Sequence, residues 1–206
     1  MAQTEEDICN LMLAALKADM ITDINGAGIA AQLCKLVLPE MRDAELRAHA
    51  WNVSTRFATI AADTVTPPFK YERRYPLPNG PEDEAQGVPP YCLRVLRING
   101  EAQWKKRWRI MGRYLYTNEG PGALELEFTG RVTNIAQYDP LLVQAIALRC
   151  GNWLAFRFSG SAALKQAIQA DYALLAEQAR QVDAMEGYPD EDEDDLAPER
   201  WEESRL

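Results

Sequence analysis

The chain has 206 residues, of which 47% are hydrophobic, and its formal net charge is −9. A chain of this length can bury a sizeable core in one domain or in two small ones. Its longest apolar stretch, residues 141–158, is interrupted by Gln144, Arg149 and Asn152, and acids closely follow Met1, so we expect no membrane span, no signal peptide and a cytoplasmic origin.

Most of the negative charge lies at one end of the chain. Residues 186–206 hold ten acids and two arginines, and they therefore carry −8 of the net charge. The remaining residues are nearly neutral, so the acidity describes a tail and says little about the body.

Residues that bind metals and cofactors are sparse. Cys9, Cys34, Cys92 and Cys150 lie dozens of residues apart with no CxxC pair, which is typical of free thiols in a reducing compartment. The glycines match no phosphate-binding loop, and the acidic run 190–195 lacks the glycine and spaced ligands of an EF-hand. We therefore expect no metal and no cofactor.

Two helices are predicted at the start of the chain. Thr4 is an N-cap candidate followed by acids, and helical spacing of apolar residues predicts a helix over about residues 5–18. A second helix is predicted over residues 29–49, with a kink or a fresh start at Pro39. The apolar positions are Ile8, Leu11, Met12, Ala15 and Leu16 in the first helix, and Leu33, Leu36, Val37, Met41 and Leu46 in the second.

Strands are predicted over residues 52–138, where the apolar period changes toward two. Residues 91–98 alternate, with Cys92 and Ile98 on one side and Val95 on the other, and residues 107–118 read as two short strands joined at Gly112. Residues 124–129 alternate, with Leu124, Leu126 and Phe128 on one side and Glu125, Glu127 and Thr129 on the other. Residues 76–90 are too rich in proline, glycine and acids for a strand, so we expect a long exposed loop there.

Two further helices follow. Asp139 and Pro140 form an N-cap and first-turn pair, and the apolar run after them, which includes Trp153 and Phe156, predicts a helix buried on most of its faces. Residues 159–161 end this helix and cap the last one, which stops at Gly187.

The order of these elements predicts an α+β protein. A four-helix bundle comes from residues 1–51 and 139–187, and an inserted antiparallel β domain of sandwich or barrel-like form comes from residues 52–138. Residues 188–206 form an extended acidic C-terminal arm.

The run WKKRWR, residues 104–109, is the nearest approach to a nucleic-acid-binding signal, because bases stack on aromatic rings and Lys or Arg neutralises phosphates. As a strand, the same run places both tryptophans on a half-buried side and Lys105, Arg107 and Arg109 on a solvated basic side. The second interpretation is favoured because the body has no net positive charge, and a nucleic-acid-binding module stays as an alternative.

The sequence contains little evidence for catalytic residues. His49, the only histidine, has no GxSxG motif or positioned cysteine nearby, and beside Trp51 at a helix end it is expected to be a cap or packing residue. Glu125 and Glu127 could serve a glycosidase, but alternating acids are also typical of a solvent-facing strand. We expect the chain not to be an enzyme, with a tail-associated polysaccharide or cell-wall hydrolase as a further alternative.

The tail combines an acidic spacer with apolar residues. Six consecutive acids cannot join a core, which favours a solvated extension. Leu196, Pro198, Trp201 and Leu206 follow these acids, and an exposed tryptophan on such an arm favours a partner pocket. We expect an arm that orders on binding.

Five segments together resemble one known family. They are RDAELRAHAWN, YPLP with the later CLRVLRING, RVTNIAQYDPLLVQAIALRCGNWLAF, SGSAALKQAIQADYALLAEQARQVDAMEG and the acidic tail with Trp and Arg. In order and spacing, over nearly the whole chain, they are similar to the head-to-tail adaptor of short-tailed bacteriophages, the tail tubular protein A family.

This resemblance implies a virion structural protein. It implies a dodecameric ring beneath the portal protein and above the tail nozzle (tail tubular B) protein, around the channel for genomic DNA, in a short tail assembled in the host cytoplasm. The arm would reach the portal. The portal-binding residues expected from it are Tyr188, Leu196, Trp201, Arg205 and Leu206.

Two positions depart from the family pattern. Ala50 precedes Trp51 where the family usually has proline, and the loop 79–90 is longer than the usual link. We interpret the loop as a phage-specific decoration, directed toward tail fibres or a neighbouring subunit. Because a channel for DNA in transit should not hold a polyanion tightly, we also expect Lys105 and its basic neighbours to point away from the lumen, and the DNA to pass without specific binding.

Overall fold

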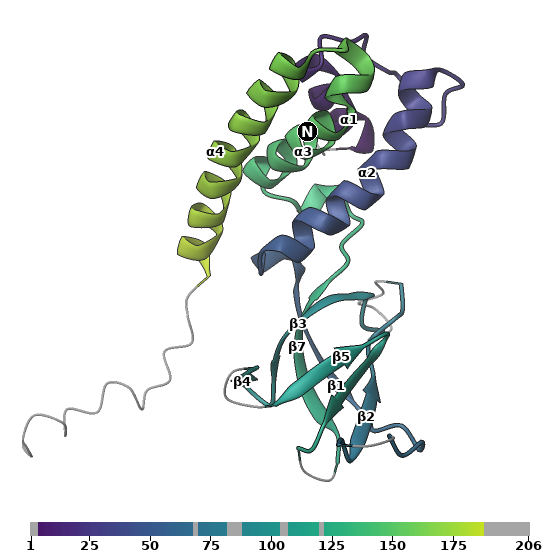
Figure 1. Ribbon diagram of the computed structural model, residues 1–206, viewed down its shortest axis with the longest axis vertical. Coiled ribbons are helices and arrows are strands. Elements are labelled where there is room, and N and C mark those ends of the chain that lie inside the picture. Colours follow the sequence, from purple (N-terminus) through teal and green to yellow (C-terminus); the bar gives the residue numbers. More distant parts are fainter. Residues whose placement is uncertain (1–3, 68–69, 82–87, 104–106, 120–121, 188–206) are drawn as a thin grey trace, which may run out of the picture.

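The computed structural model describes residues 4–67, 70–81, 88–103, 107–119 and 122–187. Within them the chain is of mixed α+β class, as predicted, with four α-helices and two antiparallel sheets. The helical part consists of α1 (Glu5–Ala15), α2 (Ile29–Ala48), α3 (Pro140–Ser159) and α4 (Ala162–Glu186). Figure 1 shows these helices at one end of the molecule and the strands, which come between α2 and α3 in sequence, at the other. Among the described helices none is both long and apolar enough to cross a membrane.

Three helices begin at caps that the sequence predicts. Thr4 and Asp7 form a reciprocal capping box at α1, in which each side chain accepts a hydrogen bond from the other residue's backbone N–H. The Asp139 carboxylate accepts a bond from the Leu141 N–H at 2.7 Å, and the Ser161 hydroxyl accepts one from the Leu164 N–H at 3.2 Å. These bonds satisfy N–H groups that the first helical turn leaves unpaired.

Helix α1 ends at Ala15, three residues before the predicted end. Lys17 adopts a left-handed conformation with φ 55°, the Lys17 N–H donates to Ala14, and the Ala18 N–H donates to Leu13. This is a Schellman C-cap made without glycine, which the residue pattern does not reveal. The exposed Leu11 also departs from the predicted stripe, and Cys9 and Leu13 are buried beside Ile8 and Met12 instead.

Helix α2 passes through Pro39 as one helix, so the fresh start considered at this proline is absent. Proline removes one backbone hydrogen bond, but Val37 and Leu38 before it and Leu46 after it are all buried in the helical core. Packing on both sides of Pro39 therefore keeps the segment helical. Leu36, predicted on the apolar stripe, is 68% exposed.

The strands form two antiparallel sheets. One has the order β1 (Thr55–Ile60), β7 (Leu124–Gly130), β3 (Cys92–Ile98) and β4 (Glu101–Ala102), and the other has the order β2 (Arg73–Pro76), β6 (Tyr114–Thr117) and β5 (Trp108–Met111). As predicted, β5 and β6 are joined at Gly112, whose φ of 60° suits glycine. The alternation in β7 is confirmed for Leu124, Leu126 and Phe128, which are buried. It is wrong for Thr129, which is fully buried where β7 lies between β1 and β3.

The strict alternation predicted for β3 is wrong. Cys92, Val95 and Ile98 are all buried, although two of them were expected on one face and Val95 on the other. The register with β7 shifts between Cys92 and Arg94 and again between Val95 and Arg97. Each irregularity places one extra residue in β3 and changes the side of the sheet to which the following side chains point. Buried residues therefore recur at every third position of β3.

The loop predicted over residues 76–90 begins later than expected. Pro76 closes β2, and the next residue, Leu77, is buried and donates its N–H to the Arg113 carbonyl at 2.9 Å. Gly80 forms an isolated bridge with Pro90, which brings the two ends of the segment together. Residues 82–87 lie outside the described residues.

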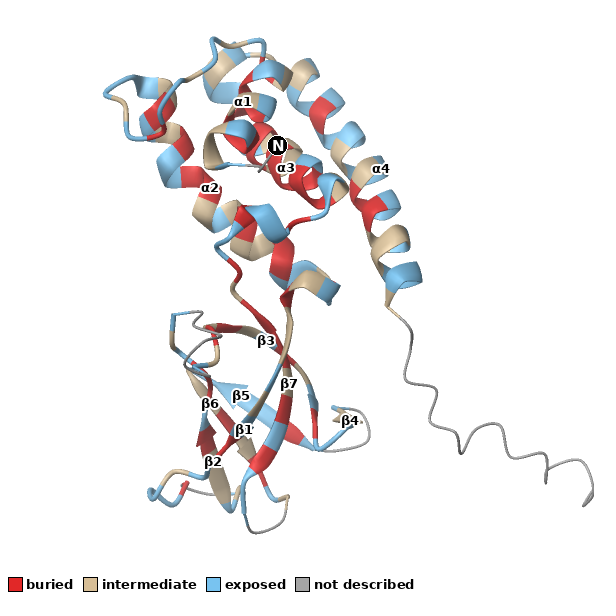
Figure 2. Ribbon diagram, turned by 180° about the vertical axis from the view of Figure 1, so that it is seen from behind, coloured by how far each residue is buried: buried red, intermediate tan, exposed pale blue. Residues whose placement is uncertain are grey.

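Two separate clusters of buried side chains hold the molecule together. The helical core contains Leu13, Leu46 and Trp51, and the strand core contains Tyr75 and Phe128. Figure 2 shows buried residues concentrated in α3 and on β3 and β7, whereas much of α4 is exposed. Val132, Ile135 and Tyr138, from the segment that returns the chain to α3, belong to the helical core. The domain boundaries themselves stay a prediction.

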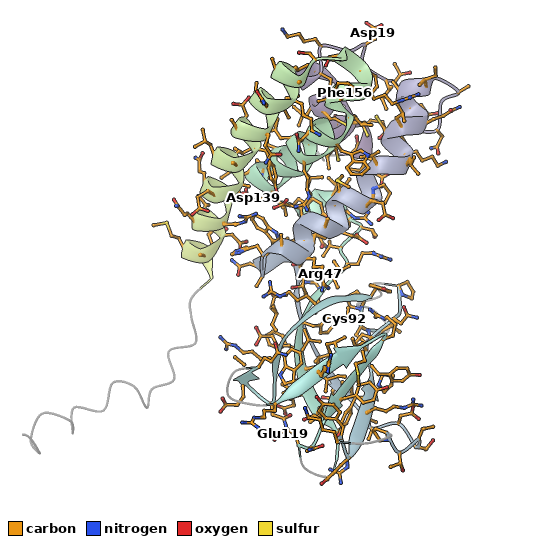
Figure 3. All side chains as sticks on the ribbon, viewed as in Figure 1. Asp19, Arg47, Cys92, Glu119, Asp139 and Phe156 are labelled. Carbon is orange, nitrogen blue, oxygen red and sulfur yellow. The ribbon has the colours of Figure 1, made fainter. Side chains whose placement is uncertain are left out.

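A few polar contacts join the helical part to the strands. Asp43 of α2 forms an ion pair with Arg131, just after β7, at 2.6 Å. Arg47, at the end of α2, donates a hydrogen bond to the Leu93 carbonyl of β3. Figure 3 labels Arg47 and Cys92 on either side of this junction. The ring of Tyr91 lies 4.4 Å from the Arg131 guanidinium, a cation–π contact that helps to hold this arginine in place for its ion pair.

Candidate assembly surface

The portal-binding residues expected from the sequence lie outside the described residues. These are Tyr188, Leu196, Trp201, Arg205 and Leu206. The structure describes the chain up to Gly187, where α4 ends, so the described candidate sites must lie on the helices and strands.

An aromatic pair stands out on α3. Trp153 is 66% exposed and Phe156 is 62% exposed, although both were expected in a helix buried on most of its faces. The other side of α3 fills the helical core with Leu142, Ile146, Cys150 and Leu154. Residues three apart share a helix face, so Trp153 and Phe156 form one apolar surface. Figure 3 shows Phe156 in the region of the helical part farthest from the strands.

Other helices also expose large apolar side chains. Ile29 and Leu36 on α2, and Leu174 and Met185 on α4, are each more than two-thirds exposed. Single exposed residues of this kind are ordinary on a soluble protein. Two neighbouring exposed aromatic side chains are less ordinary. They form a contiguous apolar surface, which is typical of a protein interaction site.

A buried polar network joins three helices. The Glu45 carboxylate of α2 is fully buried and accepts hydrogen bonds from Arg149 of α3 at 2.7 Å and from the Tyr172 hydroxyl of α4 at 2.6 Å. Arg180 of α4 lies 3.5 Å from its other oxygen. Arg149 precedes Trp153 by one helical turn and so shares its side of α3, where it ties this helix to α2 and α4 beside the aromatic pair.

The environment of the network shifts two pKa values. Burial, followed by the hydrogen bond to Glu45, raises the pKa of the Tyr172 hydroxyl. For Arg149, burial is the largest influence and acts to lower the pKa, but the hydrogen bonds and charge interactions with Glu45 and Tyr172 together outweigh it, and the pKa is raised. The arginine therefore stays charged and the phenol stays protonated around the buried carboxylate.

The last turn of α4 is attached to the end of α2. Asp183 accepts a hydrogen bond from the Asn52 N–H at 3.1 Å and lies 3.3 Å from His49. Burial raises the pKa of Asp183, against the opposing influence of Asn52 and His49. His49 is the C-cap of α2, and its ring packs edge-on against Trp51 at 4.8 Å, so the predicted cap or packing role is confirmed.

The contact between Asn52 and α4 fixes where the C-terminal arm begins. The Asn52 side chain donates a hydrogen bond to the Asp183 carbonyl at 2.6 Å. A Cβ atom on Gly187 would come within 2.7 Å of the Asn52 side-chain oxygen. The backbone of Gly187 therefore approaches Asn52 too closely for a larger residue without a shift of the asparagine.

The remaining sequence candidates are dispersed. Glu125 is exposed on β7, and Glu127 lies 3.7 Å from Arg97. The four cysteines are free and buried, and burial raises the pKa of Cys92 to about 11 despite nearby Arg113 and Arg47. In the described part of the chain, no three His, Cys, Asp or Glu side chains are arranged to hold a metal ion.

The basic run follows the strand interpretation where it is described. Trp108 is buried at the start of β5, whereas Arg107 and Arg109 are exposed. Trp104, Lys105 and Lys106 lie outside the described residues, so the expectation that Lys105 points away from a channel stays a prediction.

Sequence reasoning missed both the aromatic surface and the Glu45 network. Trp153 and Phe156 continue an apolar run that looks like core, and the partners of Glu45 are 104 and 127 residues away in sequence. Arg149, a charged residue within that apolar run, was the one available signal.

The chain matches no model of a known protein family. It also has no match among curated proteins.

Proposed function

We propose that this chain is a virion structural protein, the head-to-tail adaptor of a short-tailed bacteriophage. Copies of it form a ring, a dodecamer by the family pattern, between the portal protein and the tail nozzle protein. The ring surrounds the channel for the genome, and double-stranded DNA passes without specific binding. The loop around residues 79–90 is directed toward tail fibres or a neighbouring subunit.

Support comes first from the resemblance of five segments to the tail tubular protein A family. The finer fold in this proposal is a four-helix bundle with an inserted sandwich or barrel-like β domain. The close association of α3 with α4, α1 and α2 agrees with a bundle. A nearly neutral body agrees with a channel that does not retain DNA.

The exposed pair Trp153 and Phe156 carries the assembly part of the proposal. An oligomeric ring must bury apolar flanks that a free subunit exposes, and aromatic residues are enriched in such interfaces. The pair lies on a helix whose other face is fixed in the core, so it is presented on a rigid element. The acidic arm, which starts at the end of α4, supplies a second contact, toward the portal.

The test is the mass of assemblies formed by the full chain with its portal ring, measured by native mass spectrometry. We expect the wild-type chain to add to the portal as a closed ring. The double variant Trp153→Ser/Phe156→Ser should fold, with an unfolding free energy within about 0.5 kcal/mol of wild type, but should fail to close a ring. Phe57→Ser, which removes an aromatic that is 76% exposed on β1, is the matched control.

Either of two results would contradict the proposal. Wild-type chain that does not associate with the portal would remove the adaptor assignment. Normal rings from the double variant would remove Trp153 and Phe156 from the interface. Salt-dependent binding of the isolated chain to DNA would favour the nucleic-acid-binding alternative instead.

A further inference from the structure

A cationic pocket lies at the junction of the helical part and the strands. Its volume is ≈ 490 Å³, and its walls come from the end of α2, from β3 and from the β5–β6 hairpin. Four arginines line it: Arg47, Arg94, Arg109 and Arg113. No described residue of the lining is an Asp or a Glu. Figure 3 marks the place by Arg47 above and Cys92 below, both of which belong to the lining.

Two buried donors in the lining lack an acceptor. Trp108 is 8% exposed, and its indole Nε1 is buried without a hydrogen-bond partner in the described structure. The Nε of Arg113 is buried and unpartnered in the same way. Buried N–H groups are nearly always hydrogen-bonded, so two orphan donors lining one pocket indicate a missing acceptor.

The positive charge of the pocket is not neutralised within the described residues. Arg47 donates to the Leu93 carbonyl and Arg113 donates to the Cys92 carbonyl at 2.8 Å, and these neutral acceptors fix the guanidinium groups without cancelling their charge. Arg94 and Arg109 are exposed, and neither forms an ion pair with a described carboxylate. Guanidinium groups bind carboxylates and phosphates in a two-pronged geometry, so the pocket suits an oxyanion.

A ligand of this kind is present in the same chain. Residues 190–195 are six consecutive acids, and they begin three residues after Gly187. Gly187 packs against Asn52, and Asn52 follows Arg47 by five residues, a span of at most about 18 Å. The eight residues from Gly187 to residue 195 can extend over roughly 28 Å, so the acids can reach the Arg47 side of the pocket.

We propose that the arginine pocket binds carboxylates of this chain's own acidic segment, residues 190–195. Trp108 and Arg113 donate to the carboxylates from within the pocket, and Arg94 and Arg109 pair with them at its rim. Because the segment is tethered close by, its effective concentration is on the order of millimolar, which favours it over a free anion. The arm is thereby held on the strands until a partner competes for it. This holds whether or not the chain is a phage adaptor.

The test follows the indole N–H resonance of Trp108 in the full-length chain by ¹H–¹⁵N NMR, with the resonance assigned from Trp108→Phe. The comparison is a full-length variant with all six acids neutralised: D190N, E191Q, D192N, E193Q, D194N and D195N. We expect the Trp108 resonance to lie downfield in the wild type and to move upfield in the neutralised variant. A nitroxide on Ala197→Cys should broaden the resonance only when the acids are intact. It labels selectively because the four native cysteines are buried.

Substitutions in the pocket complete the test. Arg94→Gln/Arg109→Gln should weaken the nitroxide effect at Trp108, whereas Arg157→Gln, which removes an exposed arginine from α3, should leave it unchanged. If the arginine variants do not fold, the neutralised variant still decides, since its changes lie entirely beyond Gly187.

Three results would overturn the proposal. The Trp108 resonance could be identical in the wild type and the neutralised variant, which would mean that the acids do not occupy the pocket. Inorganic phosphate could shift Trp108 in the neutralised variant while the acids have no effect in the wild type, which would assign the pocket to another anion. In a mixture, nitroxide-labelled chains at natural isotopic abundance could broaden the Trp108 resonance of ¹⁵N-labelled chains that carry no nitroxide. If broadening arises only in this way, between chains, the occupant of the pocket is the acidic segment of a second copy.

Discussion

Glu45 is the residue on which the arrangement of three helices depends. Its carboxylate is fully buried, and it stays there because Arg149, Tyr172 and Arg180 supply donors from two other helices. An ion pair of this kind adds little stability compared with an apolar pair of the same shape. Removing only one member is costly, however, since it leaves buried charge unpaired.

We therefore expect Glu45→Ala to lower the free energy of unfolding by about 3 kcal/mol, because Arg149 and Arg180 lose their counter-charge in a partly buried site. Urea denaturation followed by circular dichroism measures this change. Glu40→Ala, an exposed glutamate on the same helix, should change the free energy by less than about 0.5 kcal/mol. Equal effects of the two substitutions would show that the network does not hold the helices together.

At the scale of elements, the end of α4 depends on a single carboxylate. Asp183 joins this helix to His49 and Asn52, and the arm starts five residues later. Burial makes its charged form unfavourable, and the two partners only partly compensate, so the pKa is raised above the ordinary value of 3.8.

This direction predicts the sign of a pH effect. The folded chain holds the Asp183 proton more tightly than the unfolded chain, so the contribution of this group to stability is fully present below pH 3.8 and is lost as the pH rises through the raised pKa. The unfolding free energy of the wild type, minus that of Asp183→Asn, should therefore fall as the pH rises above 3.8. Asp171→Asn on the exposed side of α4 controls for the loss of one charge. A rising difference would mean that His49 and Asn52 outweigh burial.

At the scale of the whole molecule, two cores share few contacts. The helical core and the strand core have no buried residue in common, and the joint between the parts relies on Arg131 with Asp43 and on Arg47 with Leu93. Two chain connections cross this joint, through the 3₁₀ turns Asn52–Ser54 and Ile135–Gln137. The polar joint therefore determines how strongly the two parts unfold together.

Breaking the joint should separate their unfolding. We expect helix loss at 222 nm and loss of the near-ultraviolet aromatic signal to coincide on heating the wild type. In Arg131→Gln the two midpoints should differ by roughly 4–8 °C, which corresponds to about 1 kcal/mol in a part of this size. Arg157→Gln, which changes an arginine away from the joint, should leave the midpoints together. Coincident transitions in Arg131→Gln would show that apolar contacts alone couple the two parts.

Features that depend on a few neighbouring residues were determined by the sequence alone. Thr4 with Asp7, Asp139 with Pro140, and the hairpin at Gly112 are local arrangements, because a cap or a turn is completed within about four residues. The alternation from Leu124 to Phe128 and the order of helices and strands were predictable for the same reason. The charge of the arm also follows from composition.

The tertiary structure alone decided which apolar and polar groups face outward or remain unpaired. Trp153 and Phe156 belong to an apolar run, but α3 can turn only one face to α1, α2 and α4, so they are left outside. The irregularities in β3, the partners of Glu45 and the orphan nitrogen of Trp108 depend on contacts with residues far away in sequence. Periodicity predicts which residues share a face of a helix or strand. Only tertiary packing determines which other element, if any, covers that face.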